Sequence, residues 1–327
     1  MVVLDNLHPQ VHGHGASAPR MGDNVEFIHG DVCEGPALKQ AVEKDVDLVF
    51  HLAAETGTGQ SYDEVTRYCN VNVLGTTRLI EALRALPARP RRIVLAGSRA
   101  VYGEGAYVDQ DGQSTIAHPR KPADLRMGVF EPLDDNRRPL IAQATRETLS
   151  PNPASIYAST KLMQELVLSQ GLEGTDAELV LLRFQNVYGP GQSLKNPYTG
   201  VLSIFCQQIL DGRRLNIYED GNIARDFVFV DDVVSALELA GATPAPPGGP
   251  INIGSGEATS ILSAARILMM RLTGDDRAFA ITGDFRVGDV RHAVADITRA
   301  RDLLGWTPLV SLESGLHKLA DWAKASQ

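Results

Sequence analysis

Apolar residues in this chain are grouped in short runs, and segments with helical spacing separate these runs. The run at residues 46–54 is nearly continuous in apolar residues, as expected of a strand buried on both faces of a parallel sheet. Similar runs predict strands at residues 1–7, 25–32, 92–98 and 178–184. Helices are predicted at residues 38–43, 64–86 and 161–172. This alternation predicts an α/β fold with a doubly wound parallel sheet.

The pattern changes after residue 191, where a second and smaller α/β domain begins. Amphipathic helices are predicted in it at residues 201–210 and 312–322, with a short strand at 215–218. Another short strand is predicted at 251–254, where the chain has returned to the first domain. Residues 104–153 are rich in Pro, Asp, Arg and Gly and show little periodicity. They are interpreted as an insertion that forms an ordered loop or lid, and disorder is the open alternative.

Composition limits the classes of function. The chain has 327 residues, a hydrophobic content of 43% and a charged content of 22%, which are ordinary for a globular protein. Its net charge of −9 argues against nucleic acid as a partner. Three widely spaced cysteines, Cys33, Cys69 and Cys206, favour a reducing cytosol over a disulfide framework. We see no signal peptide and no apolar run of about 20 residues, so a cytoplasmic location is expected.

Tyr157 and Lys161 are the first candidates for catalysis. A Tyr and a Lys four residues apart on a helix project from the same face. The ammonium favours the phenolate, so this Tyr can act as a base well below its usual pKa of about 10. Ser98 ends a predicted strand, at the edge where an open α/β sheet binds ligands. The alternative is a solvated Lys beside a half-buried Tyr, because this spacing also occurs by chance.

Three motifs, in order, give the chain a resemblance to a known family. They are Ser98-Arg99-Ala100-Val101-Tyr102-Gly103, Tyr157-Ala158-Ser159-Thr160-Lys161 and Arg183-Phe184-Gln185-Asn186-Val187-Tyr188-Gly189-Pro190. Together they resemble the extended short-chain dehydrogenase/reductase family, and within it the nucleotide-sugar epimerases and dehydratases. The resemblance implies a Rossmann-type domain at residues 1–185 plus 226–253. It implies a nucleotide-sugar-binding domain at 186–225 plus 254–327.

The resemblance implies NAD as the cofactor and assigns residues to it. An acid at the end of the strand at 1–7 would bind the adenosine ribose and select NAD over NADP, although an Asx turn would also explain Asp5. The implied catalytic residues are Ser98, Tyr157 and Lys161. The implied cofactor-binding residues are Asp5, Asn6, Asp31, Val32, Leu52, Ala53, Ala54, Asn72, Tyr157, Lys161 and Phe184.

The substrate implied by the resemblance is a nucleotide-diphosphate sugar. Arg225 and Arg286 would bind the diphosphate, since guanidinium groups pair with phosphate oxygens; a structural ion pair is the alternative for either arginine. The implied substrate-binding residues are Thr56, Ser98, Arg99, Asn186, Val201, Tyr218, Arg225 and Arg286. No metal is expected, because His8, His12 and His14 lie in a loop without other ligands at suitable spacing.

The chain departs from the family at its start. The first strand and the G-x-x-G-x-x-G turn, which hold the pyrophosphate, have no counterpart in this sequence. Either the sequence is truncated or the pyrophosphate cradle is lost, so retention of NAD is in question. A sheet without this strand is expected to expose apolar surface.

The expected activity is 4-epimerisation by transient oxidation at C4. Arg99-Ala100 follows Ser98 where 4,6-dehydratases carry acidic residues, so dehydration is disfavoured. The segments at 55–61 and 198–202 and the insertion look most like enzymes of dTDP-deoxysugars, such as dTDP-L-rhamnose 4-epimerases. A 4-ketosugar reductase and a non-catalytic nucleotide-sugar-binding protein are the alternatives. A homodimer is expected from the resemblance.

Overall fold

The structure is a computed structural model that describes residues 1–194, 196–198 and 200–326. The chain forms two compact units. The first comprises Met1–Gly97, Ser155–Leu182 and Leu237–Pro250. The second comprises Ser98–Ala154, Arg183–Ala236 and Ile251–Gln327. The functional division predicted above stays a prediction, because compactness does not show where a ligand binds.

The first unit contains the parallel α/β layers. Its N-terminal part holds β1 (Val2–Asp5), α1 (Pro9–His12), β2 (Glu26–His29), α2 (Gly35–Val42), β3 (Leu48–His51), α3 (Gln60–Asp63) and α4 (Val65–Tyr68). A π-helix (Cys69–Leu74), α5 (Gly75–Arg84), β4 (Arg92–Ser98), α7 (Ile156–Gly171) and β8 (Glu178–Phe184) follow. Strand β13 (Pro250–Ile253) begins at the last residue of this unit and continues in the second. The helix predicted at 64–86 is therefore α4 and α5 joined by a π-helical segment.

Four strands form the main sheet, in the order β13-β8-β4-β3. Strands β3 and β4 are parallel, with Leu48 opposite Arg92 and His51 opposite Leu95. Every residue of β4 is buried, as the apolar run predicted. Leucines and isoleucines of α2, α5 and α7 pack against β4 and β8 to form the core of this unit. The α/β class and the parallel pairing are confirmed.

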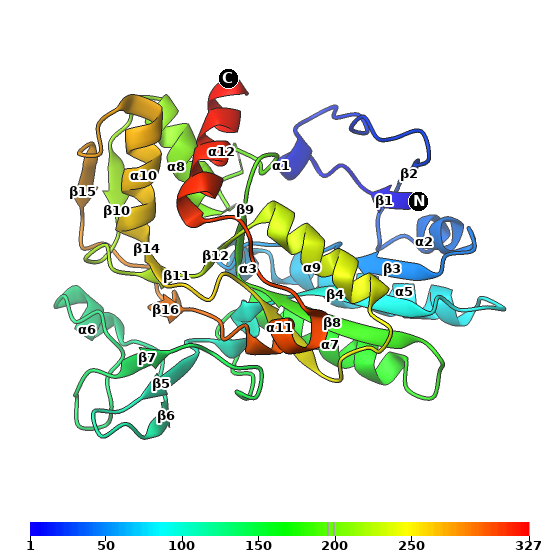
Figure 1. The fold of residues 1–327 in the computed structure, drawn as a ribbon, viewed down its shortest axis with the longest axis horizontal. Helices are drawn as coiled ribbons and strands as arrows, with labels where there is room; N and C mark the ends of the chain where they lie inside the picture. The colour runs from blue at the N-terminus through cyan, green and yellow to red at the C-terminus, as the bar shows by residue number, and fades with distance from the viewer. Residues whose placement is uncertain (195, 199, 327) are drawn as a thin grey trace. The chain divides into compact units, whose positions relative to one another are not determined.

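Strand β3 lies at an edge of this sheet, and β1 and β2 form a separate parallel pair (Figure 1). Burial of the whole run at 46–54 was wrongly predicted, because Phe50 and Leu52 are 41% and 53% exposed. The physical reason is that, in the part of the chain that the structure describes, no strand pairs with the second edge of β3. The expected exposure of apolar surface is confirmed at these two side chains.

The second unit begins with the insertion and continues to the C-terminal helix. Its first elements are the 3₁₀ helix Arg99–Tyr102, β5 (Ala106–Val108), β6 (Ser114–Ile116), α6 (Pro122–Arg126), β7 (Ile141–Gln143), β9 (Asn186–Tyr188) and α8 (Val201–Leu210). Then come β10 (Leu215–Ile217), β11 (Ala224–Arg225), β12 (Phe227–Phe229) and β14 (Thr259–Ser260). Helix α9 (Val230–Ala242) begins in this unit, and its residues from Leu237 onward belong to the first. The last are α10 (Ile261–Thr273), β15 (Phe279–Ile281), β16 (His292–Ala293), α11 (Thr298–Leu304) and α12 (Leu312–Ala325).

Helices α8, α10 and α12 pack together with β9, β10 and β12 to form the core of the second unit. Strands β10 and β15 are parallel, and β11 lies between β14 and β16. These short strands carry the segments that contain Arg225 and Tyr218. The helix predicted at 201–210 coincides with α8.

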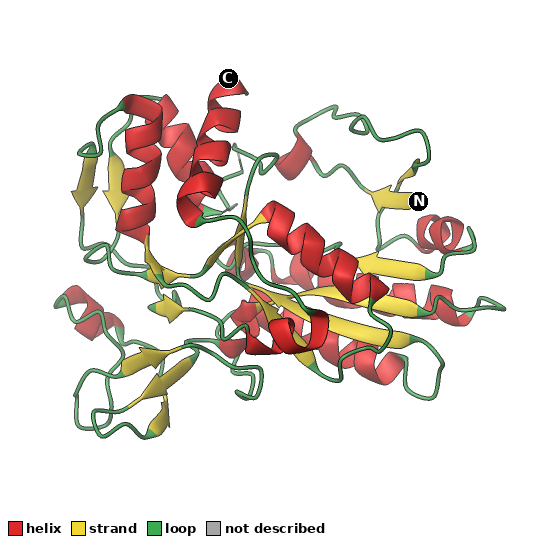
Figure 2. Cartoon of the chain, in the orientation of Figure 1, coloured by secondary structure: helices red, strands yellow, loops and turns green. Residues whose placement is uncertain are grey.

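The insertion at 104–153 has regular structure, which the sequence did not predict (Figure 2). Strands β6, β5 and β7 form a three-stranded antiparallel sheet, and Tyr107, Ala117 and Leu140 pack as its small core. Each strand has only three residues, so a period of two could not be recognised.

Among the described residues, no helix has the length and apolar character needed to cross a membrane.

Candidate active site

Helix α7 carries Tyr157 and Lys161 in its first two turns. It begins after Ser155, whose side chain caps the helix by accepting a hydrogen bond from the Ala158 N–H at 3.1 Å. Tyr157 is half-buried, and its ring meets the ring of Tyr68 edge-on, with centroids 6.4 Å apart. This packing fixes the side of α7 from which Tyr157 projects.

Lys161 is almost completely buried, with 4% of its surface exposed. Its Nζ donates a hydrogen bond to Oε1 of Gln164 at 2.8 Å. Burial lowers the pKa of Lys161 to about 8, and the nearby Glu165 acts in the opposite direction. The side chain is therefore still cationic at neutral pH, which is the state that favours a phenolate at a neighbouring tyrosine.

Ser98 is the last residue of β4 and lies at the carboxyl end of that strand. It is 8% exposed, and its Oγ accepts a hydrogen bond from the Ala100 N–H at 3.2 Å. This bond caps the 3₁₀ helix that follows and fixes the hydroxyl at the strand end. Ser98 falls in the second compact unit and Tyr157 in the first, so their joint action stays a prediction.

Asp5 and Asn6 lie at the carboxyl end of β1, as predicted for the ribose site. Oδ1 of Asp5 accepts a hydrogen bond from the Leu7 N–H at 2.7 Å, which is the Asx-type turn of the alternative interpretation. Its side chain is 44% exposed and has further lone pairs to accept other donors. Both roles are therefore compatible with the geometry.

Asp31 follows β2 and lies beside Asn6. Its Oδ2 accepts a hydrogen bond from Nδ2 of Asn6 at 2.8 Å, and its Oδ1 accepts one from the Cys33 N–H at 2.7 Å. Burial alone would raise the pKa of Asp31, but these hydrogen bonds lower it below the usual value. Asp31 is therefore an anion at neutral pH and can accept a hydrogen bond from the amino group of a base.

The remaining predicted cofactor contacts lie at strand ends or just after them. Ala53 and Ala54 are small and half-buried after β3, and Leu52 is exposed. Val32 packs closely on Gly75: a Cβ added at Gly75 would lie 2.8 Å from Cγ2 of Val32. Phe184 ends β8 and is half-buried.

Asn72 is fully buried in the π-helical segment. Its Nδ2 donates to the Glu55 carbonyl at 3.1 Å and to Thr160 Oγ1 at 2.9 Å, and its Oδ1 accepts from the Glu55 N–H at 2.7 Å. It therefore joins the segment after β3 to α7. The exposed Thr56 follows in that segment, and its carbonyl accepts a hydrogen bond from the Tyr68 hydroxyl.

These residues of the first unit fit the two ends of NAD in chemistry. Partly exposed carboxylate and amide groups suit the adenosine end, and small residues with a buried ammonium suit the nicotinamide ribose. The set contains no glycine-rich turn of the kind that cradles a pyrophosphate.

Arg225 and Arg286, the predicted diphosphate arginines, each have a partner within the second unit. Nη2 of Arg225 donates to Oδ1 of Asp289 at 2.7 Å, and Arg225 is 9% exposed. The exposed Arg286 places its guanidinium 5.2 Å from the ring centroid of Tyr218. Arg225 therefore has the ion pair of the alternative interpretation, and this pair links it to the segment that carries Arg286.

Arg99 is a further cation of the same unit. Its Nη2 donates to the Gly103 carbonyl at 2.8 Å. Burial, and next the charge of Arg225, lower the pKa of Arg99 to about 10. A bound anion would reduce the repulsion between the positive charges of Arg99 and Arg225.

The other predicted substrate contacts of this unit lie at the starts of elements. Asn186 begins β9 and Val201 begins α8, and both are half-buried. Thr199 of the segment at 198–202 lies outside the described residues.

The sequence did not predict the charged network that attaches the insertion to the rest of its unit. Arg120 of the insertion donates to Oε1 of Glu219 at 2.8 Å and to the Asp289 carbonyl at 2.7 Å. Arg291, 2% exposed, donates to Glu131 and Glu219, both at 2.8 Å. The insertion is thereby tied to the segment that pairs with Arg225.

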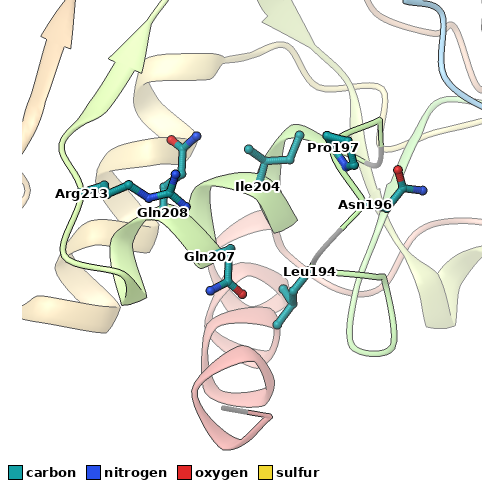
Figure 3. A pocket seen from close by; sticks show the side chains of 7 residues that line it. All are labelled: Leu194, Asn196, Pro197, Ile204, Gln207, Gln208 and Arg213. Carbon is teal, nitrogen blue, oxygen red and sulfur yellow. The ribbon is translucent and has the colours of Figure 1, made fainter. Parts of the chain in front are cut away.

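A pocket of about 410 Å³ lies beside α8 in the second unit (Figure 3). Asn196, Ile204, Gln207 and Arg213 are among the residues that line it. The guanidinium of Arg213 pairs with Asp211. No residue of the lining belongs to the predicted sites, so we assign the pocket no role in the reaction.

Sequence reasoning also missed the residues around Tyr157 and Lys161. Tyr68, His51 and Gln164 belong to no recognisable motif. A single polar residue in a helix or strand gives no sequence pattern that shows it to be buried. Thr76 lies one helical turn after Asn72, and this spacing was the available signal.

Comparisons with known proteins give one consistent family. Residues 131–254 match the model of the NAD dependent epimerase/dehydratase family, and residues 6–123 match that of GDP-mannose 4,6 dehydratase. The chain is 41% identical to a dTDP-L-rhamnose 4-epimerase of Burkholderia thailandensis, over 98% of this chain and 87% of that protein.

Solved structures agree. The sequence of this chain is 30% identical to that of MoeE5, whose structure is in complex with UDP-glucose and NAD. The two structures match with a TM-score of 0.74, over 99% of this chain and 90% of that one. A UDP-glucose 4-epimerase of Thermotoga maritima with UDP-glucose is 26% identical, with a TM-score of 0.77 and coverage of 99% and 91%.

Proposed function

The chain belongs to the NAD-dependent epimerase/dehydratase family, and we propose that it is an NAD-dependent nucleotide-sugar 4-epimerase. The observation that carries the proposal is the identity of 41% with a 4-epimerase over nearly the whole chain. The buried Lys161, placed one helical turn after Tyr157, supports it from the structure. Arg99 and Ala100 after Ser98 favour epimerisation over dehydration, because neither side chain supplies an acid for loss of water.

Three residues share the proposed chemistry. Tyr157, as the phenolate, accepts the proton of the sugar 4-hydroxyl at its phenolic oxygen. The Lys161 ammonium keeps the pKa of that tyrosine low enough for this role. Ser98 donates a hydrogen bond to the same sugar oxygen and stabilises the charge that develops on it. The proton returns from Tyr157 after the sugar has presented its other face.

NAD, when bound, supplies the acceptor and donor for the C4 hydride. Asp5 and Asn6 would bind the adenosine ribose, and Asp31 with Val32 the adenine. Asn72 would orient the segment that faces the nicotinamide ribose, where Lys161 donates. The other proposed contacts are Leu52, Ala53, Ala54 and Phe184.

The proposed substrate is a dTDP-deoxysugar, as the name of the Burkholderia thailandensis relative indicates for that protein. Arg225, Arg286 and Arg99 are the cations available for its diphosphate. Thr56, Ser98, Asn186, Val201 and Tyr218 are the remaining proposed contacts. With the site goes the proposed division into a cofactor domain at 1–185 plus 226–253 and a sugar-nucleotide domain at 186–225 plus 254–327.

A cytoplasmic location and a homodimer are also part of the proposal. The acidic composition and the three unpaired, widely spaced cysteines support the location. Exposed Met163 and Leu166 of α7 and Leu74 of the π-helix support an association of two copies, because large apolar side chains at a helical surface favour an interface.

Substitution of the proposed base gives the first test. Tyr157→Phe removes the proton acceptor, so 4-epimerisation of dTDP-L-rhamnose in the presence of NAD should fall about 10²–10⁴-fold. The measurement is conversion followed by NMR, with the exposed Tyr62→Phe as matched control. Equal rates in Tyr157→Phe and the parent would contradict the assignment. Consumption of added NADH with a 4-keto sugar, without epimerisation, would instead identify a reductase.

A further inference from the structure

Lys161 ends a chain of buried polar side chains formed by Gln164, Thr76 and His51. Gln164, which is fully buried, lies between Lys161 and two residues from other elements. Its Oε1 accepts from Nζ of Lys161 at 2.8 Å. Its Nε2 lies 3.0 Å from Oγ1 of Thr76 in α5 and 3.3 Å from Nε2 of His51 in β3. One amide thus connects the ammonium to Thr76, and through Thr76 to His51.

The orientation of the Gln164 amide follows from the chemistry of its partners. An ammonium can only donate hydrogen bonds, so the amide oxygen must face Lys161 and the amide nitrogen must face away. The Thr76 hydroxyl donates to the Asn72 carbonyl at 2.6 Å, so its oxygen accepts the bond from Gln164. Thr76 therefore holds the amide nitrogen of Gln164, and this contact keeps the amide oxygen directed toward Lys161.

His51 is a neutral member of this chain. It is 4% exposed, and its Nε2 lies 2.8 Å from Oγ1 of Thr76. Burial, and next the charge of Lys161, lower the pKa of His51 to about 3. A second cation is thereby kept away from the ammonium at all pH values at which the protein is expected to work.

We propose that Gln164, anchored by Thr76, to which His51 also donates, is a positioning residue that holds the Lys161 ammonium in its buried place one turn after Tyr157. The bond to Gln164 stabilises the charged form of a lysine whose pKa burial lowers. Its importance for the reaction rests on the proposed function, but the contact itself does not. Lys161 is thus placed by α5 and β3 as well as by its own helix.

Other charged or titratable groups lie on α7 and on α4, which packs against it. Glu165 lies four residues after Lys161 on α7 and favours the charged form of Lys161. Tyr157 lies one turn earlier, with Tyr68 of α4 against its ring. Arg67 of α4 is paired with Glu55 at 2.7 Å and with the neighbouring Glu64. None of these groups replaces the acceptor that Gln164 provides, so its removal should be measurable.

Titration of Lys161 tests the proposal directly. Protein with ¹³C-labelled lysine is titrated by NMR, and the Lys161 Cε signal is assigned with Lys161→Arg. The signal should titrate near pH 8 in the parent protein. Gln164→Met removes the acceptor and should lower the midpoint by about one pH unit, whereas Gln164→Glu should raise it by about one. Gln170→Met, on the exposed face of the same helix, should leave it unchanged.

An unchanged Lys161 midpoint in folded Gln164→Met would overturn the proposal. If Gln164→Met does not fold, Gln164→Glu and Thr76→Val decide. The first should raise and the second should lower the midpoint, and no shift in either would equally overturn it. The titration does not need turnover. Shifted midpoints in a protein without epimerase activity would therefore leave the positioning role standing and reject the proposed function alone.

Discussion

At the scale of the residue, close packing around Gly97 holds β4 in place. A Cβ added at Gly97 would lie 2.8 Å from the Leu182 carbonyl oxygen and 3.3 Å from Oε1 of Glu165. The nearer of these atoms belongs to the backbone of a buried strand and cannot rotate away. Glycine is therefore required here for space, because any side chain would separate β4 from β8 just before Ser98.

Substitution of Gly97 by alanine should destabilise the fold. Gly97→Ala forces a methyl group against backbone, which typically costs about 1–3 kcal/mol of unfolding free energy. Urea denaturation followed by circular dichroism measures the loss. Gly22→Ala is the matched control, because nothing lies within 4 Å of a Cβ at that loop position. A loss in Gly97→Ala no larger than in the control would show that β4 and β8 can separate freely.

The residues with a motif could be predicted from the sequence, and their neighbours could not. The spacing of Tyr157 and Lys161 is visible because it matches the helical repeat. Gln164, three residues after Lys161, also fits the helical repeat. Glutamines at helical surfaces are common, however, and only burial distinguishes this one. For Arg225, the sequence left open a diphosphate contact or an ion pair, and the structure adds the pair with Asp289.

At the scale of the element, the edge position of β3 has the largest consequences. An edge strand presents backbone groups and side chains that a neighbouring strand would normally cover. Phe50 and Leu52 remain exposed for this reason, although their sequence is typical of a central strand. The apolar pattern predicts the strand correctly but cannot show whether a neighbour is present on each side.

A charge on this edge should reduce exposed apolar surface without unfolding the protein. Leu52 is 53% exposed, so Leu52→Lys should change the unfolding free energy by less than about 0.5 kcal/mol. Binding of the dye ANS and light scattering on concentration should both decrease. Leu268→Lys, at a fully buried position of α10, should by comparison prevent folding. A destabilisation of Leu52→Lys by several kcal/mol would show that this edge is covered.

Other elements show which patterns are reliable. Strand β8 and helix α8 have the predicted bounds, because each has a complete apolar run or a complete amphipathic period. The π-helical segment between α4 and α5 was not predictable, since the helical period continues through it with one wide turn. The three-residue strands of the insertion are stabilised by their pairing and by contacts such as that of Arg120 with Glu219, which are not local in sequence.

At the scale of the whole molecule, the two units carry different parts of the proposed reaction. The first has the lysine, the tyrosine and the groups that suit the ends of NAD. The second has Ser98 and the arginines suited to a diphosphate. The relatives match along 98–99% of this chain, so the matched length includes both units. The protein as a whole should therefore transfer the C4 hydride and return it within one bound sugar nucleotide.

The most direct test uses dTDP-L-rhamnose labelled with deuterium at C4, incubated with the protein and NAD and followed by NMR. An epimerase of this mechanism gives the C4 epimer with the deuterium still at C4, because the hydride returns to the carbon it left. Folded, NAD-loaded protein that leaves C4 unchanged would contradict the epimerase, and loss of the label to solvent would contradict the mechanism.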